Sequence, residues 1–133
     1  MKLDQDTLRL SATDLANHLA CRHLTDLDRG AAEGLWKPPD WYRPEAAVLA
    51  ERGLEHERAY LAHLENQGRT ITRLDEADGR RALERTVAAM YAGADVIAQA
   101  TLANGRWLGR ADVLLRVGRP SGLGDWSYEA LDT

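Results

Sequence analysis

The sequence predicts a mixed α/β fold of the α+β kind, in which helices come first and an antiparallel meander of three strands follows. Helical spacing of apolar residues dominates the earlier part of the chain. The later part instead has β-branched and alternating segments, separated by a tight-turn signal and by a stretch rich in Pro, Gly and Ser. Helices followed by consecutive strands are typical of α+β or mixed α/β domains.

Three helices are expected. The sequence S-A-T-D has the form of a capping box and opens a first helix over about residues 11–29. A second helix, over about residues 44–67, begins at a proline, which suits the first helical position, and is followed by a glycine that ends it. Residues 69–74 could form a short strand, and a third helix is expected over about residues 79–93. The apolar stripe of the second helix comprises Ala47, Ala50, Leu54, Leu61 and Leu64.

Three strands are expected after the helices, over residues 95–102, 106–117 and 125–133. Asn104-Gly105, between the first two strands, is a strong signal for a tight hairpin turn. The third strand reaches the end of the sequence without a turn signal. We therefore expect residues 1–133 to be the N-terminal part of one domain that is truncated within this strand.

Composition restricts the class of protein. The chain has 133 residues, of which 29% are charged and 44% hydrophobic, a balance ordinary for a globular protein and not for a disordered one. Because it has neither an apolar run of about 20 residues nor a signal peptide, no membrane association is expected. A single cysteine is typical of a reducing compartment, so we expect the cytoplasm. The formal net charge of −4 argues mildly against a nucleic-acid coat protein, but acidic metal ligands in a nuclease also lower the formal charge.

Three residues stand out as candidate metal ligands: His56 in G-L-E-H, Asp112 in G-R-A-D, and Asp132 in E-A-L-D. Aspartate is depleted inside strands, and Asp112 is expected in mid-strand on the face opposite Ala111 and Val113. Two aspartates on neighbouring strands repel each other unless a cation or a proton intervenes. Carboxylates with one imidazole are suitable ligands for Mg²⁺ or Mn²⁺. The alternative is a surface histidine and two strand-end aspartates that pair with arginines.

The order of these motifs resembles that of the RecB-like nucleases of the PD-(D/E)XK superfamily. G-x-x-H on a helix, G-R-A-D in a strand and a final acidic strand follow one another here as in that family. More narrowly, L-S-A-T-D-L-A-N-H-L-A-C-R-H, R-G-L-E-H-E-R-A-Y-L and G-R-W-L-G-R-A-D-V-L-L-R-V look like segments of bacterial RecB-like nucleases allied to the CRISPR-adaptation exonucleases. The resemblance covers nearly the whole chain and implies the start of a restriction-endonuclease-like core.

The resemblance implies a role for each motif residue. In that family the helical histidine and the two acids bind the metal, here His56, Asp112 and Asp132, and the two aspartates would be the catalytic acids. The residue after the second acid offers its backbone carbonyl to the metal, here Thr133. A lysine follows in the family, and the sequence ends before that position. The resemblance therefore implies a deoxyribonuclease dependent on Mg²⁺ or Mn²⁺, with the chain of 133 residues inactive alone.

The resemblance also suggests a role for Cys21. In relatives, a cysteine of this early helix joins three later cysteines around a [4Fe–4S] cluster, which needs about four thiolates. This sequence has one cysteine, so its iron–sulfur site would be incomplete and a cluster would belong to a full-length parent. The alternative is an ordinary free cysteine.

DNA is the partner that the resemblance implies, and Gln99, Arg106 and Arg110 are the residues that could contact it. The two arginines could equally be solvated or paired with acids. A helicase or a CRISPR-type protein would be a further partner, and the sequence does not choose between them. The alternative functions are a non-catalytic nucleic-acid-binding or interaction module that retains the nuclease fold, and a purely structural fragment.

Overall fold

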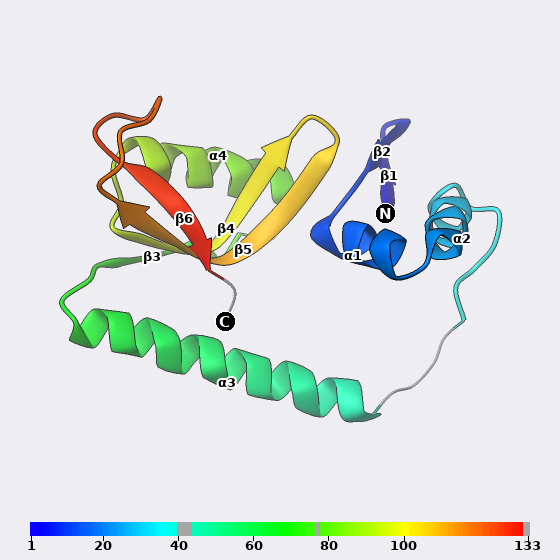
Figure 1. Ribbon diagram of the computed structural model, residues 1–133, viewed down its shortest axis with the longest axis horizontal. Coiled ribbons are helices and arrows are strands. Elements are labelled where there is room, and N and C mark those ends of the chain that lie inside the picture. Colours follow the sequence, from blue (N-terminus) through cyan, green and yellow to red (C-terminus); the bar gives the residue numbers. More distant parts are fainter. Residues whose placement is uncertain (40–43, 77, 132–133) are drawn as a thin grey trace. The chain divides into compact units, whose positions relative to one another are not determined.

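The computed structural model describes residues 1–39, 44–76 and 78–131. The chain divides into two compact units, one formed by Met1–Tyr42 with Ala103–Gly109 and the other by Arg43–Leu102 with Arg110–Thr133. Within the described residues there are four helices and two sheets, so the prediction of a mixed α/β fold is confirmed (Figure 1). No helix in these residues is long and apolar enough to cross a membrane.

The first unit begins with a small hairpin that the sequence analysis did not predict. Strands β1 (Lys2–Asp4) and β2 (Thr7–Arg9) pair antiparallel. The two residues between them, Gln5 and Asp6, both have positive φ, 44° and 64°, as a type I′ hairpin turn requires. Glycine or asparagine usually occupies such positions, so the turn has a weak sequence signal.

Helices α1 (Ala12–Ala20) and α2 (Arg22–Ala32) replace the single helix expected over residues 11–29, so that prediction is wrong. Its N-terminal signal is confirmed, because Ser11 and Asp14 form a capping box at the start of α1. The break falls at Cys21, whose backbone is extended with φ −159° and ψ 115°.

The physical reason for the break is a set of contacts across the corner between the two helices. Asn17 Nδ2 donates to Asp28 Oδ2 over 3.1 Å, and His18 Nδ1 lies 2.8 Å from Thr25 Oγ1. No glycine or proline marks this position, so periodicity alone could not locate the break.

The second unit contains the main sheet and two helices. Helix α3 (Pro44–Asn66) leads to β3 (Ile71–Arg73), and α4 (Gly79–Tyr91) leads to β4 (Val96–Asn104). Strands β5 (Trp107–Val117) and β6 (Ser127–Leu131) follow. Part of the β4–β5 hairpin, Ala103–Gly109, belongs to the first unit.

The prediction of an antiparallel meander of three strands is wrong. Among the described residues the sheet has four strands in the order β3-β4-β5-β6, and β3 pairs parallel with β4 through Ile71↔Val96 and Thr72↔Ile97. A parallel pair needs a long crossover connection, and α4 supplies it. Strands β5 and β6 pair antiparallel, with Val113 opposite Leu131.

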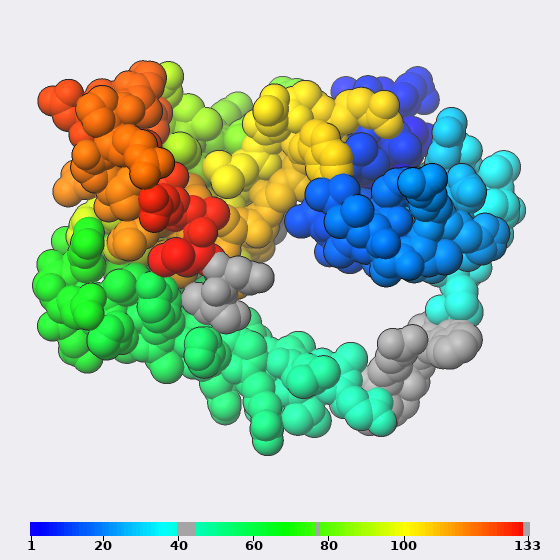
Figure 2. All heavy atoms as spheres, in the orientation of Figure 1, coloured from blue at the N-terminus to red at the C-terminus, as the bar shows by residue number. Residues whose placement is uncertain are grey.

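Each face of the sheet is covered by one helix (Figure 1). Leucines from the second half of α3 pack on one face in the α3-face cluster, and the opposite face carries the α4-face cluster, against which Ala89 and Met90 of α4 pack. Figure 2 shows atoms of β6, in red, against the green C-terminal half of α3. The buried members of the α3-face cluster are Leu61, Leu64, Val96, Ala98 and Val113. Those of the α4-face cluster are Leu74, Ile97, Ala100 and Leu114.

The predicted apolar stripe of α3 is buried only in the second half of the helix. Leu61 and Leu64 are 2% and 5% exposed, whereas Leu54 is 52% exposed. Ala47 and Ala50 are also exposed. The part of α3 that positions side chains against the sheet therefore begins after Leu54.

Candidate metal centre

The candidate centre lies where β4 and β5 interrupt their regular alternation. In β4, Ile97 and Ala100 both belong to the α4-face cluster, although residues three apart in a regular strand point to opposite faces. Gln99 between them has a positive φ of 59°. This left-handed conformation, unusual for glutamine, turns the side chain of Gln99 toward α3.

Strand β5 shows the same interruption beside Gln99. Ala111 and Leu114 both pack with the α4-face cluster, while Val113 belongs to the α3-face cluster. Asp112 stands between Ala111 and Val113, whose side chains pack in opposite clusters, so its own face does not follow from regular alternation. The expectation that Ala111 and Val113 share a face opposite Asp112 is therefore wrong, because local alternation fails at this kink.

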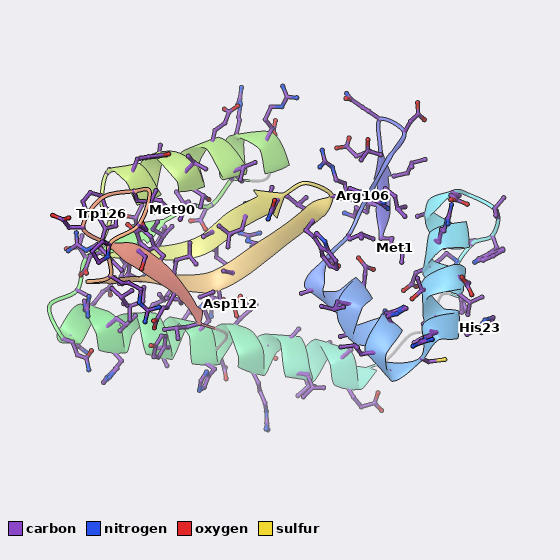
Figure 3. All side chains as sticks on the ribbon, turned by 45° about the horizontal axis from the view of Figure 1, so that its top comes forward. Met1, His23, Met90, Arg106, Asp112 and Trp126 are labelled. Atoms are coloured by element: carbon purple, nitrogen blue, oxygen red, sulfur yellow. The ribbon has the colours of Figure 1, made fainter. Side chains whose placement is uncertain are left out.

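Gln99 and Asp112 occupy matching positions on adjacent strands. Strands β4 and β5 are adjacent and are joined by a two-residue turn at Gly105-Arg106. The two residues are equally far from this turn along their strands, and each lies where its strand interrupts the alternation of faces. Asp112 is half-buried and lies on β5 near the end of β6 (Figure 3).

The second candidate aspartate, Asp132, and the proposed carbonyl ligand, Thr133, lie outside the described residues. The last described residue of β6 is Leu131, which is paired with Val113. Val113 directly follows Asp112, so the described end of β6 lies next to the part of β5 that carries Asp112.

His56 is exposed on α3. The residue after it, Glu57, is half-buried and accepts a hydrogen bond from Gln99 Nε2 to its Oε1 at 2.6 Å. Tyr60, one turn further along the helix, packs against the α3-face cluster. His56 is therefore at the margin of the helix face that meets the sheet, next to a direct contact between α3 and β4.

Glu57 is a residue of this region that sequence reasoning missed. Its only signal was its place in G-L-E-H-E-R, directly after the candidate histidine. The glycine of the same motif, Gly53, does not mark a close approach, because a Cβ added there would meet no atom within 4 Å.

Gln99, Arg106 and Arg110, the residues expected to contact DNA, have different surroundings. Gln99 is engaged by Glu57. Arg106 is exposed, and its Nε donates to the carbonyl of Leu8 at 3.3 Å, so it holds the β1–β2 hairpin of the first unit. Arg110 is exposed on β5.

Cys21 is a free, exposed cysteine at the junction of α1 and α2. Because it is the single cysteine in the sequence, its thiol does not amount to the roughly four thiolates that an iron–sulfur cluster needs.

Two of the three predicted side-chain ligands fall within the described residues, and no complete set of metal ligands is assembled there. Residues 1–39, 44–76 and 78–131 contain no group of three or more His, Cys, Asp or Glu side chains placed to hold a metal ion. Of the three predicted side-chain ligands, His56 and Asp112 fall within these ranges. An imidazole and a half-buried carboxylate are donors that fit Mg²⁺ or Mn²⁺ in combination with a further carboxylate.

Comparison with models of known protein families, with curated proteins and with solved structures gives no match to this chain. A function for the chain therefore has to be argued from its motifs and from the arrangement of the site.

Proposed function

We propose that the chain belongs to a metal-dependent nuclease of the RecB-like kind, which hydrolyses DNA phosphodiester bonds. The observation that carries the proposal is the placement of Asp112. This aspartate is half-buried in β5 where the alternation of faces is interrupted, and the residue after it, Val113, packs in the α3-face cluster. A carboxylate is unusual inside a strand, where a packing role would favour an apolar residue.

The order of motifs and the register of β6 give further support. The last described residue of β6, Leu131, pairs with Val113, which directly follows Asp112 in β5. In the proposed site, His56, Asp112 and Asp132 hold Mg²⁺ or Mn²⁺, and the carbonyl of Thr133 is a further ligand. Oxygen donors with one imidazole are suited to these cations.

The bound metal would polarise the scissile phosphate and lower the pKa of an attacking water. The chain's own residues would hold this cation in position. The two carboxylates would supply the negative charge that holds it. Strain in the left-handed backbone at Gln99 is consistent with a functional position, because such conformations cost about 1–3 kcal/mol and cluster at active sites.

In the family that the motifs resemble, a lysine follows the residue corresponding to Thr133. On the proposed site it would share a strand face with Asp132, since residues two apart in a strand point the same way. It would offset negative charge that builds up on the phosphoryl oxygens. The chain of 133 residues contains no residue at that position.

The test compares two polypeptides. One is the chain of 133 residues, and the other continues past Thr133 with a lysine at the next position. Degradation of single- and double-stranded DNA is measured with Mn²⁺ and with EDTA. We expect the longer polypeptide to cleave about 10²–10³ times faster, and Asp112→Ala to abolish its activity.

Equal cleavage by both polypeptides, with both sensitive to Asp112→Ala, would contradict the role given to the lysine. DNA binding without cleavage by the longer polypeptide would instead favour the non-catalytic module.

A further inference from the structure

The hydrogen bond between Glu57 and Gln99 joins the two elements that carry the proposed site. Gln99 Nε2 donates to Glu57 Oε1 at 2.6 Å, a short bond to a carboxylate in a partly buried setting. Hydrogen bonds with an ionised partner are about twice as strong as neutral ones. The bond links β4 to α3 across a long separation in sequence, so it fixes tertiary structure.

Both partners adjoin proposed metal ligands. Glu57 directly follows His56 on α3, and Gln99 lies on the strand next to that of Asp112, equally far from the turn that joins the two strands. A shift of α3 relative to β4 would therefore change the separation of His56 and Asp112 directly.

The backbone conformation of Gln99, which makes the hydrogen bond to Glu57, is strained. A left-handed glutamine is strained by about 1–3 kcal/mol and persists only where surrounding contacts hold it. Glycine would take this conformation without strain. A glutamine here gains a side chain that reaches Glu57.

We infer that Glu57 and Gln99 form a positioning pair that fixes the distance between His56 on α3 and Asp112 on β5. This inference rests on the proposed function. The pair acts through its hydrogen bond: Glu57 is not itself a ligand of the metal, and the charge of its carboxylate is not required. Removing a residue that orients a metal ligand typically lowers the affinity for the metal by about 10–100-fold.

The test measures the affinity of the chain for Mn²⁺ by electron paramagnetic resonance, together with the thermal unfolding midpoint of each variant. Gln99→Gly removes the side chain but relieves the strained backbone, so we expect Mn²⁺ affinity to fall about tenfold while the unfolding midpoint does not fall. Glu57→Gln keeps a side-chain oxygen that can accept the hydrogen bond from Gln99. Because this contact is retained, the Mn²⁺ affinity of the variant should stay within about threefold of the wild-type value.

The double variant Glu57→Gln with Gln99→Glu reverses donor and acceptor and should also bind Mn²⁺ within about threefold of wild type. Glu84→Gln is the matched control, because Glu84 is an exposed glutamate on α4, which covers the other face of the sheet.

Two outcomes overturn the inference while leaving the proposed function intact. Unchanged Mn²⁺ affinity in Gln99→Gly would show that the Glu57–Gln99 hydrogen bond does not position the metal ligands. A tenfold loss in Glu57→Gln that the double variant does not restore would mean that the carboxylate acts through its charge. If instead wild type shows no Mn²⁺ binding that depends on Asp112, the proposed function fails and the inference fails with it.

Discussion

At the scale of single residues, Thr86 shows how the crossover helix is tied to the sheet. Its side chain is fully buried, its hydroxyl donates to the carbonyl of Ala82 at 2.8 Å, and its oxygen accepts from the backbone N–H of Thr101 at 3.0 Å. A buried N–H without a partner costs about 1–3 kcal/mol. The hydroxyl therefore has a structural role that a methyl group of similar size could not perform.

Thr86→Val should lower the free energy of unfolding by about 1–3 kcal/mol, because it leaves the Thr101 N–H unsatisfied. Thr86→Ser keeps the hydroxyl and should lose less. Urea unfolding curves for the three proteins check this, and a valine variant more stable than the serine variant would contradict the role of the hydroxyl.

Asp95, directly before β4, contacts the two residues before β3 and an arginine of β5 through its carboxylate. Oδ1 accepts from Arg69 Nη1 at 2.7 Å, Oδ2 accepts from the Thr70 N–H at 3.2 Å, and Arg116 lies 3.9 Å away. Burial raises the pKa of Asp95, but the hydrogen bonds and the two arginines outweigh burial, and the net pKa is lowered.

The lowered pKa predicts the pH dependence of stability. The folded protein holds the Asp95 proton less tightly than the unfolded chain, whose pKa is about 3.9. The stabilisation is therefore complete above the unfolded pKa and is lost as pH falls through the lower folded pKa.

Asp95→Asn should cost about 1 kcal/mol at neutral pH, a modest value because the ion pairs are partly exposed. The difference from wild type should shrink below about pH 4. Unfolding free energies measured across this range check the prediction. Asp75→Asn, at an exposed position after β3, is the control, and an Asp95→Asn difference that grows on acidification would contradict the assigned ion pairs.

At the scale of elements, the C-terminal half of α2 is packed by a tryptophan from the segment that follows it. Trp36 packs against Gly30 of α2, and its Nε1 donates to the carbonyl of Leu27 at 3.0 Å. A Cβ on Gly30 would lie 2.1 Å from the Trp36 ring. Glycine is needed here for close approach of an aromatic ring, although it is a poor helix former.

Two glycine substitutions should therefore have opposite effects. Gly53→Ala in α3 meets no atom within 4 Å and should stabilise its helix by up to about 1 kcal/mol. Gly30→Ala should destabilise α2, because the indole must move and lose its bond to Leu27. Amide hydrogen exchange of α2 and α3 reports each effect locally. Slower exchange of α2 in Gly30→Ala would contradict the packing.

Several elements could be predicted from sequence because their signals are local and strong. The bounds of α3, α4 and β5 agree with the expected ranges to within a few residues, since apolar periodicity, a first-turn proline and Asn104-Gly105 determine them. The β1–β2 hairpin was missed because Gln5 and Asp6 lack the usual turn residues. The break at Cys21 depends on side chains from both helices, so it too had no local signal.

At the scale of the whole molecule, the parallel pairing of β3 with β4 was missed because partner choice depends on α4 packing across the sheet. The candidate site was predictable in part. The residue types and order of His56 and Asp112 were visible in the sequence, but the face of Asp112 was not. Ala111 and Val113, on either side of Asp112, pack in opposite clusters, so the regular alternation that the sequence suggests fails at this point of β5.

The central claim is that Asp112 holds a divalent cation, and titration of the chain with Mn²⁺ followed by electron paramagnetic resonance tests it most directly. Wild type should bind Mn²⁺ saturably, and Asp112→Asn should weaken binding by about tenfold or more, as expected when a metal site loses a key group. Asp125→Asn makes the same charge change at an exposed position before β6 and should have little effect. Equal affinity of wild type and folded Asp112→Asn, or an equal loss in Asp125→Asn, would contradict the metal site.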